Sequence, residues 1–223
     1  MEVYEYVLKE IADKDQKGKL VGVRWVDVKK GAIVRSRLVA QEFAGIDERD
    51  DLFAATPPLA ATKMCISDAA SKGDHGRGAR RLMILDVKRA FLYGEIEDVV
   101  YVRLPEEDPK YNTGVVGRLK KAMYGTRGAP HVWQKVVRNS MISLGFEMNP
   151  IFPCVYTHKG KDMIVITRGE TVDAIWTSPG LQDLAGIGLR FGCSIFRDWK
   201  TAFPKAAGFG FVPSNLSQIP AIF

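Results

Sequence analysis

The first forty residues show the alternation of apolar and polar positions that is typical of β-strands. Residues 2–13 alternate acidic and apolar side chains loosely, which is compatible with either a short helix or an edge strand. Residues 21–28 are rich in β-branched side chains and predict a strand. A turn at 29–31 and a second strand over 32–43 follow, so the two segments together predict a β-hairpin.

Two later segments have the spacing of amphipathic helices. Residues 59–71 follow two prolines and place apolar side chains on one rough face, which predicts a helix. The second half of residues 118–146 repeats apolar side chains at i, i+3, i+4 and i+7, with Pro130 in the first turn and Gly145 as a stop signal. Between these helices, residues 106–117 are polar and rich in turn formers.

Short apolar runs predict further strands. Residues 82–85 have the length and composition of a buried strand, and residues 99–104 predict another. After the second helix, residues 154–158 and 163–167 predict two short strands joined by a polar turn. Residues 190–223 are interrupted by glycine and proline and show no clear period.

A single carboxylate, Asp86, stands at the end of the apolar run at 82–85, and Phe91 and Gly94 follow it. A strand end is rigid, so an acid there can be held within the tolerance that a Mg²⁺ ion demands. The alternative is that Asp86 only ends the strand or caps the segment that follows.

Composition restricts the classes of function. The chain has 223 residues, which suits one large domain or one and a half small ones, and its hydrophobic fraction of 46% supports a sizeable core. A net charge of +6 and a pI of about 9.2 fit a polyanionic partner without requiring one. The three cysteines are far apart and predict reduced thiols in an intracellular protein, cytoplasmic or nuclear, while the three histidines are too scattered for a zinc site. No signal peptide and no apolar run of about 18 residues is present, so we expect no membrane span.

Three motif blocks carry a resemblance to a known family. Residues 85–105 read LDVKRAFLYGEIEDVVYVRLP. This segment resembles the first catalytic motif of copia-type retrotransposon reverse transcriptases, in which a strand ends in the first metal-binding Asp and a K-x-A-F-L-x-G turn follows. The matching positions are Asp86, Lys88, Ala90, Phe91, Leu92, Gly94, Glu95, Val100 and Tyr101. The resemblance implies that Phe91 lies under the sugar of the nucleotide and excludes a 2′-hydroxyl by its bulk.

The second block, residues 35–59, reads RSRLVAQEFAGIDERDDLFAATPPL and is similar to the family's K-A-R-L-V-A-x-G-F segment and the residues after it. In a polymerase this segment is the fingers hairpin, whose basic residues contact the incoming triphosphate. The resemblance therefore implies nucleotide binding by Arg35 and Arg37, and the forked guanidinium group suits a phosphate. The alternative is a solvated basic strand face.

The third block, residues 118–146, reads RLKKAMYGTRGAPHVWQKVVRNSMISLGF and is similar to the family's L-K-K-A-L-Y-G-L-K-Q-A-P-R-x-W signature. It implies that Lys120, Lys121 and Arg127 follow the nucleic-acid backbone, because phosphates supply most of the binding energy. The alternative is a solvated basic loop before an ordinary core helix. Three positions depart from the signature: Thr126, Gly128 and His131.

The family's next hairpin turn carries V-D-D, which completes the metal site. The corresponding segment here, residues 168–174, reads RGETVDA. The resemblance makes Val172-Asp173 the remnant of that motif, with Ala174, which offers no side-chain oxygen, in place of the second acid. The alternative ligand is Glu170, whose position is not the family's. The resemblance thus implies Asp86 and Asp173 as the catalytic, Mg²⁺-binding residues of a damaged two-metal site.

The resemblance covers about residues 20–180 and implies an α+β fold, namely a truncated reverse-transcriptase fingers–palm fold with an antiparallel palm sheet and packed helices. We expect residues 1–19 to be an N-terminal extension and residues 181–223 to be a divergent tail. The expected function is template-directed DNA synthesis from deoxynucleoside triphosphates on an RNA or DNA template–primer, with activity weak or absent. The alternative is a catalytically inactive transposon remnant that at most binds nucleic acid. The sequence does not indicate an oligomeric state.

Overall fold

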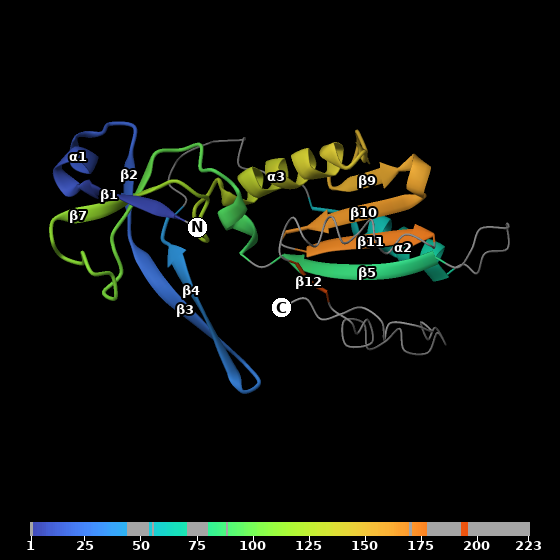
Figure 1. The fold of residues 1–223 in the computed structure, drawn as a ribbon, viewed down its shortest axis with the longest axis horizontal. Coiled ribbons are helices and arrows are strands. Elements are labelled where there is room, and N and C mark those ends of the chain that lie inside the picture. Colours follow the sequence, from blue (N-terminus) through green and yellow to red (C-terminus); the bar gives the residue numbers. More distant parts are fainter. Residues whose placement is uncertain are drawn as a thin grey trace.

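The computed structural model places two β-sheets, a projecting hairpin and three α-helices, with connecting segments (Figure 1). It describes residues 2–43, 54, 56–70, 80–87, 89–169, 171–177 and 193–195. Residues 71–79 and most of the predicted C-terminal tail lie outside these residues.

One sheet has four strands in the order β1 (Tyr4–Leu8), β7 (Val115–Leu119), β6 (Val100–Val102) and β2 (Lys19–Val21). β1 runs antiparallel to β7, whereas β2 runs parallel to β6. Helix α1 (Lys9–Lys14) follows β1 directly. The sequence of residues 2–13 was compatible with either a helix or an edge strand. The segment forms both, first an edge strand and then a helix.

The predicted hairpin is confirmed as β3 (Val23–Lys30) and β4 (Ile33–Ala40), paired along their full length. The two strands are joined at Gly31, whose φ of +62° is the left-handed conformation that glycine adopts without a steric penalty. The hairpin projects from the rest of the molecule (Figure 1). At its base Leu38 and Ala40 pack into a core cluster with the four-stranded sheet.

The second sheet is antiparallel throughout and has six strands. Their spatial order is β12 (Cys193–Ile195), β5 (Arg80–Val87), β11 (Thr171–Thr177), β10 (Met163–Arg168), β9 (Val155–His158) and β8 (Glu147–Met148). Short 3₁₀ helices, η2 (Ala90–Tyr93) and η3 (Lys159–Lys161), follow β5 and β9.

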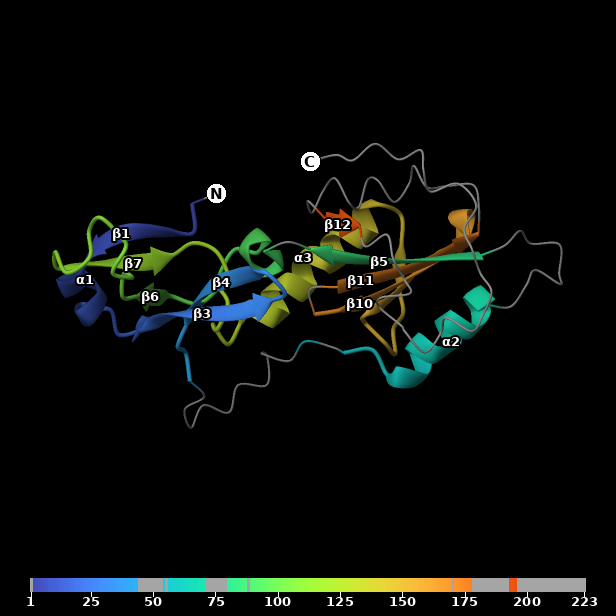
Figure 2. The same cartoon turned by 90° about the horizontal axis from the view of Figure 1, so that it is seen from below.

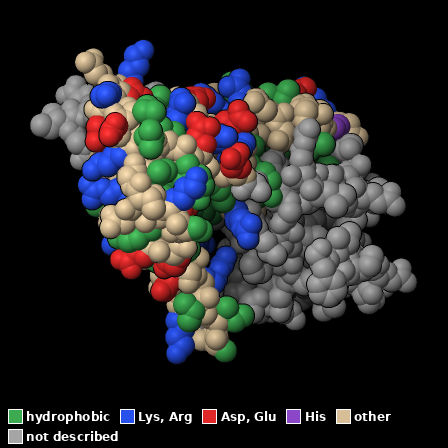
Figure 3. All heavy atoms as spheres, turned by 60° about the vertical axis from the view of Figure 1, so that its left-hand side comes forward, with side chains coloured by type: hydrophobic (Ala, Val, Ile, Leu, Met, Phe, Trp, Pro, Cys, Tyr) green, Lys and Arg blue, Asp and Glu red, His purple; other side chains and the backbone are tan. Residues whose placement is uncertain are grey.

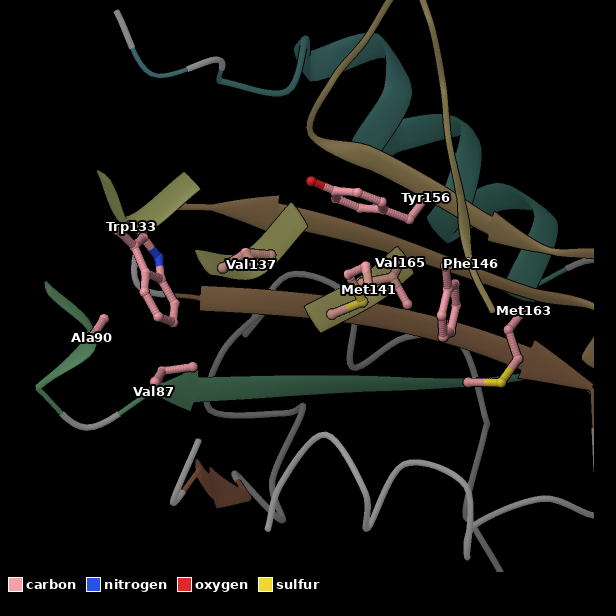
Figure 4. Close-up of a cluster of buried hydrophobic side chains, with 9 residues drawn as sticks. All are labelled: Val87, Ala90, Trp133, Val137, Met141, Phe146, Tyr156, Met163 and Val165. Carbon is pink, nitrogen blue, oxygen red and sulfur yellow. The ribbon is translucent and has the colours of Figure 1, made fainter. Parts of the chain in front are cut away.

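Helices α3 (Ala129–Ser143) and α2 (Leu59–Ala70) pack on opposite faces of this sheet. On β10, Met163 and Val165 pack with α3, whereas Ile164 and Ile166 pack with Cys65 of α2. The α3 side is the larger core, and it contains residues from both helix and strands (Figure 4). Figure 2 shows α2 on the other side of the strands.

The structure is thus mixed α and β, as the sequence predicts, and both predicted helices are present. The predicted strands at 82–85, 99–104, 154–158 and 163–167 are present with shifted ends. The interpretation of 106–117 as polar and turn-rich missed the start of β7, and β8 was not predicted. The division of the chain at residues 19/20 and 180/181 stays a prediction.

Candidate functional site

Asp86 lies in β5, one residue before that strand ends. The backbone of Asp86 pairs with Thr171 of β11 on one side and with Ser194 of β12 on the other. The next residue, Val87, is 1% exposed and packs in the α3 core. Because successive residues of a strand point to opposite faces, Asp86 occupies the face of the sheet that α2 covers.

Asp173 lies on the same face of the neighbouring strand. Its backbone pairs with Ile84 of β5 and with Ile166 of β10, and Ile166 packs with α2. Asp173 is two positions along β11 from Thr171, which pairs with Asp86. The two acids are therefore diagonal cross-strand neighbours, a relation in which backbone positions are about 7–8 Å apart.

The turn that joins β10 and β11 is not at the V-D-A remnant. Arg168 pairs with Thr171, so the turn begins at Gly169, which has φ +53°. Ala174 lies inside β11 and pairs with Val165, which is fully buried in the α3 core. The position after Asp173 consequently belongs to the opposite face from both acids.

The turn is attached to α3 through Trp133. This residue is 3% exposed, and its indole N–H donates a hydrogen bond of 2.7 Å to the carbonyl oxygen of Gly169. A buried tryptophan needs a partner for its N–H group. The sequence places Trp133 in the predicted helix and in the family signature, but it carries no signal for this contact, which depends on tertiary packing.

Residues from all three motif blocks meet at the ring of Tyr124. The guanidinium carbon of Arg37 on β4 lies 5.5 Å from the centre of that ring. The ring of Phe91 in η2 is 4.9 Å from it, centroid to centroid, at an angle of 60°. Both separations fall in the range of favourable cation–π and aromatic contacts. Arg35 is exposed and shares a strand face with Arg37.

Backbone contacts dock the end of β4 onto this segment. The N–H group of Ala40 donates a 2.7 Å hydrogen bond to the carbonyl oxygen of Tyr124. The next residue, Gly125, has φ +84°, and a Cβ atom there would overlap the carbonyl oxygen of Ala40 and lie 2.6 Å from Val39 Cγ1. Only glycine permits this approach.

The predicted backbone-binding lysines form ion pairs within the chain. Lys120 Nζ lies 3.1 Å from Glu2 and 3.2 Å from Glu5, and the hydrogen bonds to Glu2 and then Glu5 raise the pKa of Lys120. Lys121 Nζ lies 3.3 Å from Glu95. Cationic and anionic side chains alternate over the face seen in Figure 3 instead of forming one basic patch.

Arg127 has a different environment. Its backbone N–H group donates a 2.9 Å hydrogen bond to Glu42, whose side chain is 4% exposed and also lies 3.8 Å from Lys19. The segment before α3 is thereby fixed to the end of the β3–β4 hairpin.

The structure brings Arg37 and Phe91 together at Tyr124, but Lys120 lies with the N-terminal strand.

Two carboxylates, Asp86 and Asp173, are the candidate ligands for a metal ion. Among the side chains that the structure describes, no group of three or more His, Cys, Asp or Glu residues could hold an ion. The backbone register adds Asp86 and Asp173 on one face of the sheet. Two carboxylates suit one Mg²⁺ ion that also binds phosphate oxygens, because Mg²⁺ is often bound by one or two carboxylates. They do not suit two ions.

Comparison with known proteins identifies the family. The chain matches the family described as reverse transcriptase (RNA-dependent DNA polymerase) over residues 4–184. The chain belongs to this family. The reverse-transcriptase match includes every segment discussed above except β12 and the few residues before β1.

Named relatives agree with this reverse-transcriptase assignment. The chain is 31% identical over 167 residues to the retrovirus-related Pol polyproteins from transposons RE1 and RE2 of Arabidopsis thaliana, which covers 69% of the chain. It is also 31% identical over 126 residues, or 55% of the chain, to that from transposon TNT 1-94 of Nicotiana tabacum. The predicted copia-type resemblance is confirmed. The aligned part is only 10% of the RE1 and RE2 polyproteins and 9% of the TNT 1-94 polyprotein.

One further property concerns membranes. None of the helices in the described part of the chain is long and apolar enough to span a lipid bilayer.

Proposed function

We propose that the chain is a copia-type reverse transcriptase domain with a fingers–palm arrangement and a degenerate polymerase centre. In this proposal the β3–β4 hairpin acts as fingers, and the six-stranded sheet with α3 acts as the palm. The projecting hairpin and the antiparallel sheet that carries Asp86 support this assignment. The substrates would be a template–primer nucleic acid and deoxynucleoside triphosphates.

The nucleotide would bind between the hairpin and η2. Arg35 and Arg37 would hold the triphosphate through their guanidinium N–H groups, and Phe91 would lie under the sugar. The meeting of Arg37 and Phe91 at Tyr124 supports a shared site, because it brings two residues from distant segments close together. Arg37 is only partly buried, so part of its side chain is open to solvent.

Asp86 and Asp173 would hold magnesium, which when bound supplies charge neutralisation and activation of the primer 3′-hydroxyl. The observation that carries the proposal of degeneracy is the register of β11. Ala174 pairs with fully buried Val165, so the position that should supply another carboxylate lies on the opposite face of the sheet from Asp86 and Asp173. The turn has moved to Gly169, and replacing one residue would not rebuild the site.

The second candidate is a catalytically inactive remnant that at most binds nucleic acid. The same register favours it, because two diagonal carboxylates suit one ion rather than two. The ion pairs of Lys120 and Lys121 with glutamates predict modest affinity for polyanions.

Primer extension separates these candidates. The full chain is incubated with an annealed RNA template and DNA primer, the four deoxynucleoside triphosphates and Mg²⁺, with Asp86→Ala as the matched control. We expect extension no greater than that of the control, together with nucleic-acid binding that weakens as salt rises. Robust extension that is lost in Asp86→Ala would show that the centre is intact.

The Ala174→Asp variant tests the reason for degeneracy. We expect no gain of extension, because the register places residue 174 on the opposite face of the sheet from Asp86 and Asp173. Thermal unfolding and primer extension of this variant are compared with wild type. Extension gained by this single change would show that residue 174 reaches the metal site and that the register argument is wrong.

A further inference from the structure

We propose that Tyr124 is a positioning residue that orders both Arg37 and Phe91 for one nucleotide. This inference rests on the proposed function and adds a residue to that site. Tyr124 comes from the segment before α3, Arg37 from the hairpin and Phe91 from η2. Its ring is the point at which these three separate segments meet.

The geometry suits ordering of the arginine. The guanidinium carbon of Arg37 lies over the Tyr124 ring, 5.5 Å from its centre. Such a cation–π contact is made with the face of the ring and does not use the guanidinium N–H groups as hydrogen-bond donors. Arginine carries five N–H donors in a rigid plane, and these remain available for phosphate oxygens. A long side chain held by a ring loses less conformational freedom when it binds a ligand, so affinity rises.

The same ring limits the position of Phe91. The two rings are 4.9 Å apart and tilted by 60°, which is an ordinary arrangement for a stabilising aromatic pair. Phe91 is partly buried and also packs against the α3 core and against the cluster of Ala122, Ala129 and Val132, and the Tyr124 ring adds a further contact to it. Discrimination against a ribose 2′-hydroxyl would then depend on Tyr124 as well as on Phe91.

The backbone fixes where the tyrosine ring lies. Its carbonyl oxygen accepts the hydrogen bond from Ala40, and Gly125 closes against the same residue. On the far side, the N–H group of Thr126 donates to the carbonyl oxygen of Met123 at 3.1 Å, and its buried hydroxyl donates to the same oxygen at 2.8 Å. Thr126 departs from the family signature, but its hydroxyl is used to stabilise this turn.

The test measures binding of a fluorescent N-methylanthraniloyl deoxynucleoside triphosphate to the full chain by anisotropy. The variants are Tyr124→Ala, Tyr124→Leu, Tyr124→Phe, Arg35→Ala and Arg37→Ala, and Tyr111→Ala is the control for loss of an exposed tyrosine elsewhere. We expect Tyr124→Ala and Tyr124→Leu to weaken binding roughly threefold to tenfold, the range of a lost cation–π or aromatic contact. Tyr124→Phe should stay within about twofold of wild type because the ring is kept.

Two readouts distinguish positioning from a general structural role. In the Arg37→Ala background, Tyr124→Leu should weaken deoxynucleotide binding less than it does in wild type, because the partner is already absent. Competition by unlabelled ribo- and deoxynucleoside triphosphates should show that Tyr124→Leu lowers the preference for the deoxy form. Thermal unfolding of each variant checks that it is folded. If Tyr124→Ala does not fold, Tyr124→Leu takes its place in the test, because leucine keeps apolar bulk at this position.

The outcomes separate this inference from the proposed function. If Arg37→Ala weakens probe binding and Tyr124→Leu does not, Tyr124 has no positioning role, although the nucleotide site stands. Additive effects in the double variant would also overturn the inference. If neither Arg35→Ala nor Arg37→Ala changes probe binding, the proposed nucleotide site is wrong and the role of Tyr124 falls with it.

Discussion

Replacing Gly125 with alanine is expected to separate the β3–β4 hairpin from the segment that carries Tyr124. The residue has φ +84°, and the added Cβ atom would overlap the carbonyl oxygen of Ala40. That oxygen belongs to the backbone at the end of β4, so it cannot rotate away as a side chain can. One of the two segments must move, and the hydrogen bond from Ala40 to Tyr124 is then lost or lengthened.

The expected loss of stability in Gly125→Ala has two parts. An alanine in a left-handed conformation costs about 1–2 kcal/mol at any site. Forcing an atom into an occupied space costs about 1–3 kcal/mol more. Gly114 supplies the matched control, because its φ is +76° but nothing lies within 4 Å of an added Cβ atom. The Gly114→Ala variant should therefore show the first cost alone, and Gly125→Ala should show both.

Urea denaturation followed by circular dichroism measures the free energy of unfolding of both variants and wild type. For a chain of this size, each kcal/mol corresponds to about 2–4 °C in the midpoint of thermal unfolding. Equal losses of stability in the two variants would mean that Gly125 does not touch Ala40 and that the hairpin is not docked as described.

Two more predictions concern single polar groups. Tyr156 is fully buried, its hydroxyl has no hydrogen-bond partner in the described part of the chain, and burial raises its pKa to about 12. Tyr156→Phe should therefore raise the free energy of unfolding by about 1 kcal/mol in urea denaturation, and a comparable loss would show that the hydroxyl is bonded. The hydrogen bond donated by Tyr4 lowers the pKa of Asp108. The ionised Asp108 therefore stabilises the fold at pH values above its unfolded-state pKa of about 4. This stabilisation is lost as the pH falls through the lower folded-state pKa. Asp108→Asn should flatten the acid limb of a plot of stability against pH, and an unchanged limb would contradict this.

Local patterning was enough to predict much of the fold. The β-branched run and the glycine at residue 31 define the hairpin, and the periodic apolar residues before Gly145 define α3. Contacts between distant segments were not predictable in this way. Glu2 and Glu5, which pair with Lys120, lie more than 110 residues away in the sequence, the first just before β1 and the second within it, and the partner strand of β1, β7, was not predicted.

The position of the β10–β11 turn shows how a motif can mislead. The family motif suggested a turn around Asp173, whereas the structure turns at Gly169. A two-residue turn requires a positive φ, which glycine supplies readily and a β-branched residue such as Val172 does not. The sequence contained this signal, but the buried indole of Trp133 that accompanies the turn depends on tertiary packing.

The position of β1 has a consequence for any shortened form of the molecule. β1 occupies one side of β7, whose other side pairs with β6, so β7 is an interior strand. A chain that began at residue 20 would leave the main-chain N–H and C=O groups of β7 uncovered along that side. Uncovered strands recruit other chains, so self-association would be the first result of the cut, even if every residue around Tyr124 were retained.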